Sequence, residues 1–236
     1  MQDSVIREAF VDLADTLVTG YEVEDFLEKL AGYCTDAVGG EAAGVLLVHP
    51  SGELSVVAAS TEKMHALELF EMQQDEGPCR DAIRHQVQVV VTDLTETHDR
   101  WPRFTPKALE LGFRAALACP LRLRDDVVGA LNLFRATAGP FREEVAWAQA
   151  LADVATIGLL QERTIAEADR RAEQLQFALE SRVVIEQAKG IVAERLGVDM
   201  TAAFQLIRDH ARRHNMRLRD LSEAIVEGRV DTTRLR

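Results

Sequence analysis

Apolar residues recur at two different spacings along the chain, and each spacing predicts a type of element. Residues 2–18 and 23–34 carry apolar side chains three or four positions apart, which is typical of amphipathic helices. Short β-type runs lie at 42–49, 53–60, 87–92, 114–124 and 127–135. These strands are mostly linked as hairpins and alternate with helical segments. The first part of the chain is therefore predicted to be α+β, with a largely antiparallel sheet and flanking helices.

A long uninterrupted helix is predicted next. No proline occurs between Phe141 and Leu196, a span of about 56 residues. From Trp147 to Leu179 the seam positions alternate between four and three residues apart, which is the pattern of a coiled coil, and its centre is weak because Gly158 and Gln161 are poor seam residues. Its first part should pack on the sheet, whereas from Ile165 onward no sheet is left to cover. We therefore expect a parallel homodimer through about residues 145–180.

The last part of the chain predicts a small three-helix bundle. Gly197 suits a left-handed cap after the first helix, and Asp199 can accept from the free N–H groups of the second. Asn215 separates the second helix from the third. The apolar residues expected to form the core are Val184, Ile185, Ala188, Ile191, Val192, Ala203, Phe204, Ile207, Ala211, Leu218, Leu221, Ala224 and Ile225.

Charge is distributed unevenly between the two parts. The whole chain carries a net charge of −12. Residues 169–236 hold 13 Lys and Arg against 11 Asp and Glu, whereas residues 1–168 hold 14 against 28. An acidic body with a mildly basic tail indicates a polyanionic partner for the tail. A solvated basic face would give the same count.

A motif in the basic part resembles a known family. The sequence SRxxIEQAKGI at 181–191 is followed by AFxLIR at 203–208, and then by a spaced A…N…LxxL…AIV pattern. This order resembles the ANTAR domain over about 50 residues. The resemblance implies an RNA-binding effector that binds paired stem-loops in nascent transcripts and prevents transcription termination. Its candidate RNA-binding residues here are Arg182, Lys189, Gly190, Arg208, Arg212 and Asn215, where Arg212 is added because it lies one turn beyond Arg208.

Several of these residues also have simpler interpretations. Gly190 lies inside a helix, where glycine costs about 1 kcal/mol relative to alanine. It indicates either close helix packing or close approach of RNA. Arg182 could pair with Glu186 one turn later, and Arg208 with nearby acids. Phe204 is expected to be a core residue, so RNA recognition should not depend on aromatic stacking.

The segment PLRLRDDVVGALNLF at 120–134 resembles the signature of the GAF domain. The matching residues are Pro120, Leu121, Asp126, Gly129, Leu131 and Leu133. The resemblance covers about residues 5–160 and implies a sensor of small molecules, often dimeric. The candidate pocket residues are Phe70, Cys79, Trp101 and Phe113. We expect regulation and no catalytic residues here.

Cysteine chemistry and targeting give little further indication of function. The three cysteines, Cys34, Cys79 and Cys119, are far apart and form no CxxC motif, so neither a disulfide framework nor a metal site is expected. No cofactor is expected either. No apolar run is long enough for a membrane span and no secretory signal is visible, which favours a cytoplasmic protein.

Together these features predict a sensor domain at 1–160, a coiled-coil linker at 161–180 and an RNA-binding three-helix domain at 181–236. The first helix of the RNA-binding domain should continue from the linker. The predicted function is a signal-responsive transcription antitermination regulator. One alternative is a cysteine-dependent methionine sulfoxide reductase, although cysteine separations of 45 and 40 residues do not favour it. The other is a DNA-binding regulator.

Overall fold

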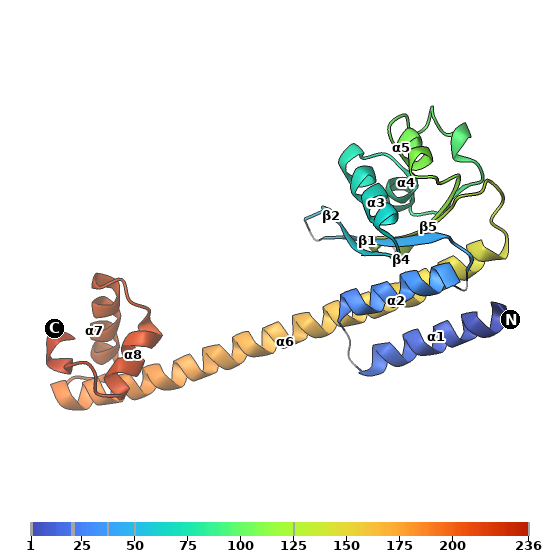
Figure 1. The fold of residues 1–236 in the computed structure, drawn as a ribbon. Helices are drawn as coiled ribbons and strands as arrows, with labels where there is room; N and C mark the ends of the chain where they lie inside the picture. Colours follow the sequence, from blue (N-terminus) through green and yellow to red (C-terminus); the bar gives the residue numbers. More distant parts are fainter. Residues whose placement is uncertain (1, 20–21, 37, 50, 125, 236) are drawn as a thin grey trace. The chain divides into compact units, whose positions relative to one another are not determined.

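The computed structural model describes residues 2–19, 22–36, 38–49, 51–124 and 126–235, with the side chains of all but 2–5 and 16–19 (Figure 1). The chain forms two compact units, Met1–Arg163 and Thr164–Arg236. Among the described residues, no helix is both long and apolar enough to cross a membrane.

The N-terminal unit is built on a five-stranded sheet. Its strands are β1 (Ala42–Val48), β2 (Leu54–Ala59), β3 (Val89–Val91), β4 (Ala115–Leu123) and β5 (Asp126–Arg135). Their order is β2-β1-β5-β4-β3, and every neighbouring pair is antiparallel. The predicted α+β fold with an antiparallel sheet is therefore confirmed.

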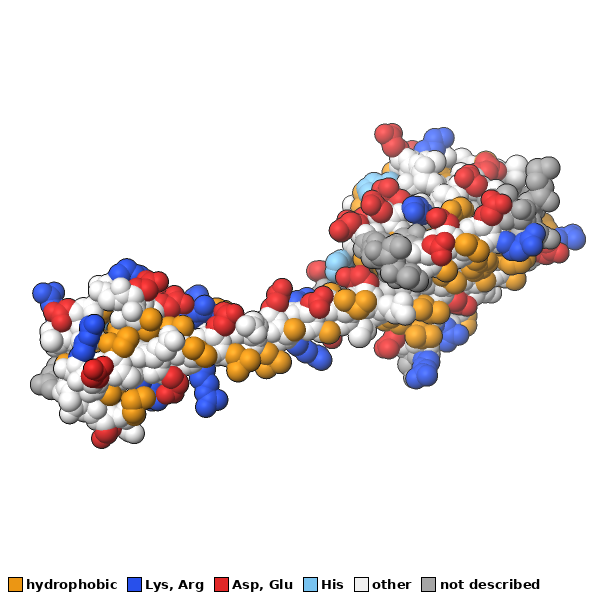
Figure 2. Space-filling view, turned by 90° about the horizontal axis from the view of Figure 1, so that it is seen from below, with side chains coloured by type: hydrophobic (Ala, Val, Ile, Leu, Met, Phe, Trp, Pro, Cys, Tyr) orange, Lys and Arg blue, Asp and Glu red, His pale blue; other side chains and the backbone are white. Residues whose placement is uncertain are grey.

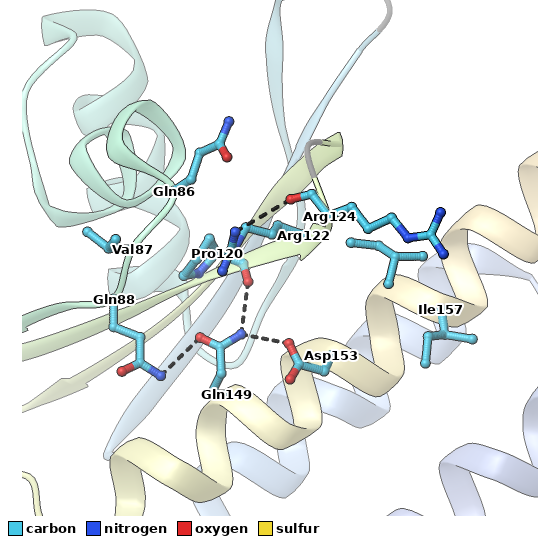
Figure 3. Close-up of a pocket in the computed structure, with 10 residues that line it drawn as sticks. Gln86, Val87, Gln88, Pro120, Arg122, Arg124, Gln149, Asp153 and Ile157 are labelled. Carbon is cyan, nitrogen blue, oxygen red and sulfur yellow. Dashed lines mark hydrogen bonds between the residues drawn. The ribbon is translucent and has the colours of Figure 1, made fainter.

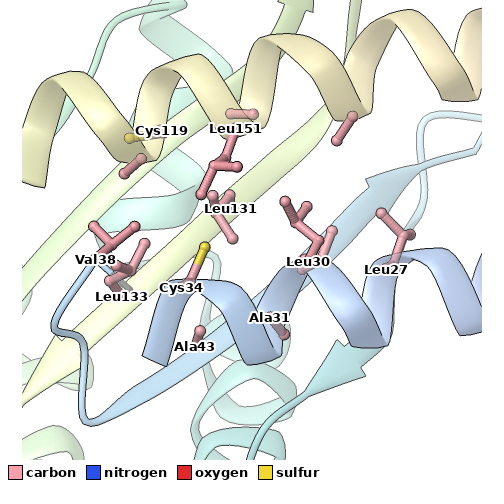
Figure 4. Packing of buried hydrophobic residues seen from close by; sticks show 14 of the residues in the cluster. Leu27, Leu30, Ala31, Cys34, Val38, Ala43, Cys119, Leu131, Leu133 and Leu151 are labelled. Atoms are coloured by element: carbon pink, nitrogen blue, oxygen red, sulfur yellow. The ribbon is translucent and has the colours of Figure 1, made fainter. Parts of the chain in front are cut away.

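One face of the sheet is covered by α2 (Val23–Asp36) and the first part of α6 (Glu143–Leu196), and α1 (Gln2–Thr19) packs on α2 farther from the sheet (Figure 1). Alternate residues of β4, among them Leu117 and Cys119, point to this side and pack against leucines and alanines of the helices (Figure 4). From α6, Ala148, Leu151 and Ala152 enter this core, as the apolar spacing predicted. The two-residue period of the strands and the 3.6-residue period of the helices thus each place apolar side chains on the surface where they meet.

The other face carries three shorter helices, α3 (Glu62–Gln74), α4 (Pro78–His85) and α5 (Phe104–Glu110), and the 3-10 turn η1 (Leu94–Glu96). The side chain of Thr61 caps α3 by accepting from the N–H of Met64 at 3.1 Å. Pro78 begins α4, where its missing N–H costs nothing. The core on this face contains aromatic residues from α5, β5 and the loops.

The C-terminal unit combines the end of α6 with α7 (Met200–Arg213), α8 (Leu218–Val226) and the 3-10 turn η2 (Thr232–Leu235). Gly197 has φ 62° and ends α6, and the Asp199 side chain caps α7 by accepting from the N–H of Ala202 at 2.8 Å. Both predicted caps are confirmed. The small core includes Ala188, Val192, Ala203, Ile207, Ala211, Leu221, Ile225 and, from the unpredicted η2, Leu235.

The stretch of α6 that lies within the C-terminal unit before the bundle is largely uncovered by the other described residues. Every residue from Arg171 to Glu180 is exposed. Leu175 and Leu179 expose 68% and 59% of their surface, and Figure 2 shows hydrophobic side chains gathered along this stretch of the helix. The predicted seam is therefore an open apolar stripe.

Candidate nucleic-acid interface and sensor domain

The outer face of α7 carries the clearest cationic pair. Ala203, Ile207 and Ala211 bury one face of this helix, so Arg208 and Arg212 lie exposed on another, one turn apart. Neither arginine forms an ion pair with any residue that the structure describes. The alternative of an Arg208 paired with nearby acids is therefore not what the structure shows. Two free guanidinium groups at this spacing can each donate a pair of hydrogen bonds to a phosphate.

Lys189 is less available than the sequence indicated. Its side chain is only 17% exposed, and Nζ lies 2.9 Å from both carboxylate oxygens of Glu186. Nζ also lies 5.6 Å from the ring centre of Phe204, within the range of a cation–π contact. Phe204, expected in the core, is only half-buried and lies beside this lysine. Glu186 pairs with Lys189 rather than with Arg182, which is exposed.

Gly190 borders an open space. A methyl group placed on its Cα would meet no atom within 4 Å outside the neighbouring helix backbone. Close packing inside the chain therefore does not explain a glycine at this helical position. The remaining reason offered by the sequence is the close approach of another molecule.

Asn215 has a local structural role that the sequence pattern only partly revealed. It adopts φ 50°, in the left-handed region, directly after α7. Its N–H donates to the carbonyl of Arg212 at 3.3 Å, and the N–H of Met216 donates to that of Ala211 at 2.9 Å. These two bonds form a Schellman motif that ends the helix. The side chain of Asn215 is exposed.

Arg219 connects two helices of the bundle through contacts that sequence reasoning missed. Its guanidinium stacks 4.2 Å from the ring centre of Phe177 and pairs with Glu223 at 2.9 Å. It also approaches Glu180 at 3.8 Å, so it fastens α8 to the exposed part of α6. The pair with Glu223 is visible in the sequence as an i, i+4 spacing. The contact with Phe177 is not, because 42 residues separate the two.

A histidine pair lies near the end of α7. The rings of His210 and His214 are 4.3 Å apart, one turn from each other. Burial lowers the pKa of His210, and the charges of His214 and Arg213 lower it further. This end of the helix therefore contains a titratable group next to the arginines.

The four pocket residues predicted for the sensor lie in different parts of the described structure. Trp101 and Phe113 belong to the core under α3–α5, where Trp101 packs edge-on against Phe104 and Phe113 packs on Phe134. Cys79 lies in a smaller cluster, and Phe70 is half-buried outside these clusters. Three of the four are thus core residues on the same face of the sheet.

A groove of about 600 Å³ lies elsewhere on the N-terminal unit, between α6, β4 and the turn before β3 (Figure 3). Gln149 of α6 connects the two sides of the groove, because its side-chain amide donates hydrogen bonds to the carbonyl of Pro120 on β4 at 3.2 Å and to Asp153 on α6 at 2.8 Å. The lining residues are Gln86, Val87, Gln88, Pro120, Arg122, Leu123, Arg124, Gln149, Asp153 and Ile157. Sequence patterns did not reveal this groove, because its residues come from three separate segments of the chain.

The cysteines have no feature of an activated thiol. All three are free and buried. Burial raises the pKa of Cys34 and Cys79, and raises that of Cys119 to about 12. The thiolate is the reactive form, so these side chains are poor nucleophiles. In the described part of the chain, no three His, Cys, Asp or Glu side chains are grouped to hold a metal ion.

Comparison with known families agrees with this architecture. The GAF domain family matches residues 21–159, which is more than half of the sequence, and the chain belongs to this family. The ANTAR domain family matches residues 173–226. An ANTAR domain implies an RNA-binding antitermination regulator, and a GAF domain is a sensory domain. No curated protein sequence matches the chain.

Solved structures support the fold of the N-terminal unit. The GAF domain of an Acinetobacter phosphoenolpyruvate-protein phosphotransferase is 13% identical with a TM-score of 0.54, covering 70% of this chain and 96% of that one. The free methionine-R-sulfoxide reductase of Neisseria meningitidis, in complex with its substrate, is 18% identical with a TM-score of 0.55, covering 68% and 91%. At such identities the likeness establishes the fold alone.

Proposed function

We propose that the protein is a signal-responsive antitermination regulator that binds stem-loop RNA in nascent transcripts, in the cytoplasm where transcription takes place. The observation that carries this proposal is the pair of exposed arginines on α7 of the ANTAR domain, Arg208 and Arg212, neither of which has an ion-pair partner among the described residues. The RNA contacts would come from this helix and from the neighbouring part of α6.

Gly190 and Lys189 extend the proposed surface from α7 to α6. The open space at Gly190 allows a sugar–phosphate backbone to approach the helix closely. Lys189 would have to exchange Glu186 for a phosphate, so its contribution to affinity should be smaller than that of Arg208. Arg182 lies on α6 as a further exposed cation, and Asn215 presents an exposed amide after α7.

We further propose a parallel homodimer through the exposed stripe of α6. Leu175 and Leu179 are the support for this, because a monomer would leave both in water. Two effectors on one coiled coil would bind two RNA loops with the avidity of a linked pair. A small-molecule ligand of the GAF domain would act by favouring one geometry of this helix over another.

The alternative functions have less support. A cysteine-dependent methionine sulfoxide reductase needs a reactive thiol, whereas Cys79 and the other two cysteines are buried with raised pKa values. A DNA-binding regulator would also use basic helices, so competition between stem-loop RNA and duplex DNA has to distinguish the two.

The test is RNA affinity as a function of salt concentration for the full chain and its variants. Each phosphate contact should contribute about 0.7–0.9 to the slope of log affinity against log salt. Arg208→Ala and Arg212→Ala should each lower this slope by about that amount, and Lys189→Ala by less. Arg234→Ala is the matched control, since Arg234 is an exposed arginine of the same unit with an ordinary ion pair to Asp231. An affinity that is independent of salt, or equal losses in all variants, would exclude the proposed interface.

A further inference from the structure

Two carboxyl groups lie in the interior of the GAF domain, where charged side chains are rare. Glu68 and Glu71 of α3 have no solvent exposure. They share the inner face of this helix with Met64 and Leu67, which are also fully buried. Acidic side chains are almost never fully buried without a partner, so this pair needs a physical explanation.

The two carboxyl groups connect α3 to the elements on either side of it. Glu71 Oε1 accepts from the backbone N–H of Cys79 at 2.7 Å and of Arg80 at 3.2 Å, and so caps the beginning of α4. Glu68 Oε1 accepts from the amide of Asn132 on β5 at 2.8 Å. The pair therefore fastens α3 both to α4 and to the centre of the sheet.

Three buried oxygen atoms at this place have no partner among the described residues. They are Oε2 of Glu68, Oε2 of Glu71 and Oδ1 of Asn132. With both glutamates ionised, all three would be acceptors with no donor, at a cost typical of buried unsatisfied polar groups. The amide of Asn132 is bonded to Glu68 on one side, so its free oxygen belongs to the same cluster.

The surrounding groups do not neutralise two negative charges. From α4, the pair is faced by the thiol of Cys79 and by Arg80, whose guanidinium forms its ion pair with Asp75. From β5 it is faced by the uncharged Asn132. From β1 it is faced by Gly44, where a methyl group would lie only 2.6 Å from Glu68 Oε1. Arg80 is therefore the single cation that faces the pair in the described structure, and another acid shares it.

We propose that Glu68 and Glu71 form a buried proton-binding site, and that its protons hold α3 and α4 on the sheet. A proton on one Oε2 converts an unpaired acceptor into a donor, for which the free oxygens of the cluster are acceptors. Loss of the protons would place two like charges in a medium of low dielectric and release the α3–α4 layer. The site would make the sensor domain responsive to pH independently of RNA binding.

The direction of the pH dependence follows from the perturbed pKa values. Burial raises the pKa of Glu68 to about 8, against the hydrogen bond from Asn132. Burial, and then the charge of Glu68, raise the pKa of Glu71, while the N–H groups of Arg80 and Cys79 act in the opposite direction. The folded domain thus keeps protons that the unfolded chain loses above about pH 4.3. Its stability should fall as pH rises through neutrality, with the folding equilibrium changing about tenfold per pH unit for each retained proton.

The first experiment uses tryptophan fluorescence to monitor unfolding. It compares the free energy of unfolding of full-length variants between about pH 5 and about pH 8. Glutamine has the shape of a protonated glutamic acid, so Glu68→Gln and Glu71→Gln should fold and each should flatten the pH dependence. Glu62→Gln is the matched control, because Glu62 is an exposed residue of the first turn of the same helix. A wild-type stability that does not fall with pH, or an equal fall in all four proteins, overturns the proposal.

A second experiment does not depend on the variants folding well. Alkylation of Cys79 at alkaline pH should exceed that of Cys34 and Cys119, which are buried on the other face of the sheet and report on unfolding of the whole domain. In wild-type protein, calorimetric unfolding at neutral pH in buffers of different ionisation enthalpy should show release of protons. Uptake or no net exchange would overturn the proposal. Stabilisation at high pH by ammonium or a primary amine, but not by sodium, would assign the site to a cation instead and would equally overturn it.

Discussion

Replacing Gly190 by alanine separates the stability of the C-terminal unit from its proposed RNA binding. The added methyl group would meet nothing within 4 Å, so no packing cost is expected. Alanine is favoured over glycine inside a helix by about 0.8–1.0 kcal/mol. Gly190→Ala should therefore stabilise this unit by up to about 1 kcal/mol while it weakens RNA binding, because the methyl group occupies the space that the RNA backbone would use.

The assay combines denaturant unfolding of the full-length variant with its RNA affinity at fixed salt. Gly32→Ala is a matched control, since Gly32 lies inside α2 and a methyl group there would also meet nothing within 4 Å. It should stabilise the N-terminal unit without changing RNA affinity. Gly44→Ala, in contrast, should be destabilising because of its contact with Glu68. Loss of stability in Gly190→Ala, or unchanged RNA affinity with a stable protein, would refute the reasoning.

Three further predictions concern the C-terminal unit. Leu175→Glu combined with Leu179→Glu should leave the chain folded but reduce its dimerisation, measured by light scattering, because unpaired charges would lie in the seam. A wild-type chain that is strictly monomeric at micromolar concentration would contradict the proposed seam. Arg219→Ala should lower the free energy of unfolding of the unit by about 1 kcal/mol, measured with denaturant, because the contact with Phe177 is lost. Arg229→Ala is the control, since Arg229 is exposed and forms an ion pair with Glu227, and an equal loss of stability in this variant would refute the prediction. Because the pKa of His210 is lowered in the folded state, the unfolded chain binds the proton more tightly. Stability should therefore decrease as pH falls below about 6.5, and His210→Gln should remove that decrease.

Local periodicity and cap chemistry predicted much of the fold. The strands of the sheet, the helix from Glu143 to Leu196 and the caps at Gly197 and Asp199 all follow from rules that operate within a few residues. The two families were also recognisable, because their motifs are contiguous.

The buried acids of the N-terminal unit and two side-chain contacts of the C-terminal unit were not predicted. Glu68 and Glu71 stand at positions i+4 and i+7 from Met64, on the buried face of α3, but acidic residues are normally assigned to solvent. The Lys189–Glu186 pair was visible as an i, i+3 spacing. The stacking of Arg219 on Phe177 depends on how α8 packs, which no local pattern encodes.

The uncovered stretch of α6 has a consequence for how the protein would respond to its own abundance. Residues 171–180 are all exposed in the single chain, and helices in water depend on packing for most of their stability. Phe177 and Glu180, which hold Arg219 and through it α8, belong to this same stretch. A second chain would therefore order the helix that positions the effector. We expect RNA-binding competence to rise steeply with protein concentration, so that the amount of protein made is itself an input to the regulator.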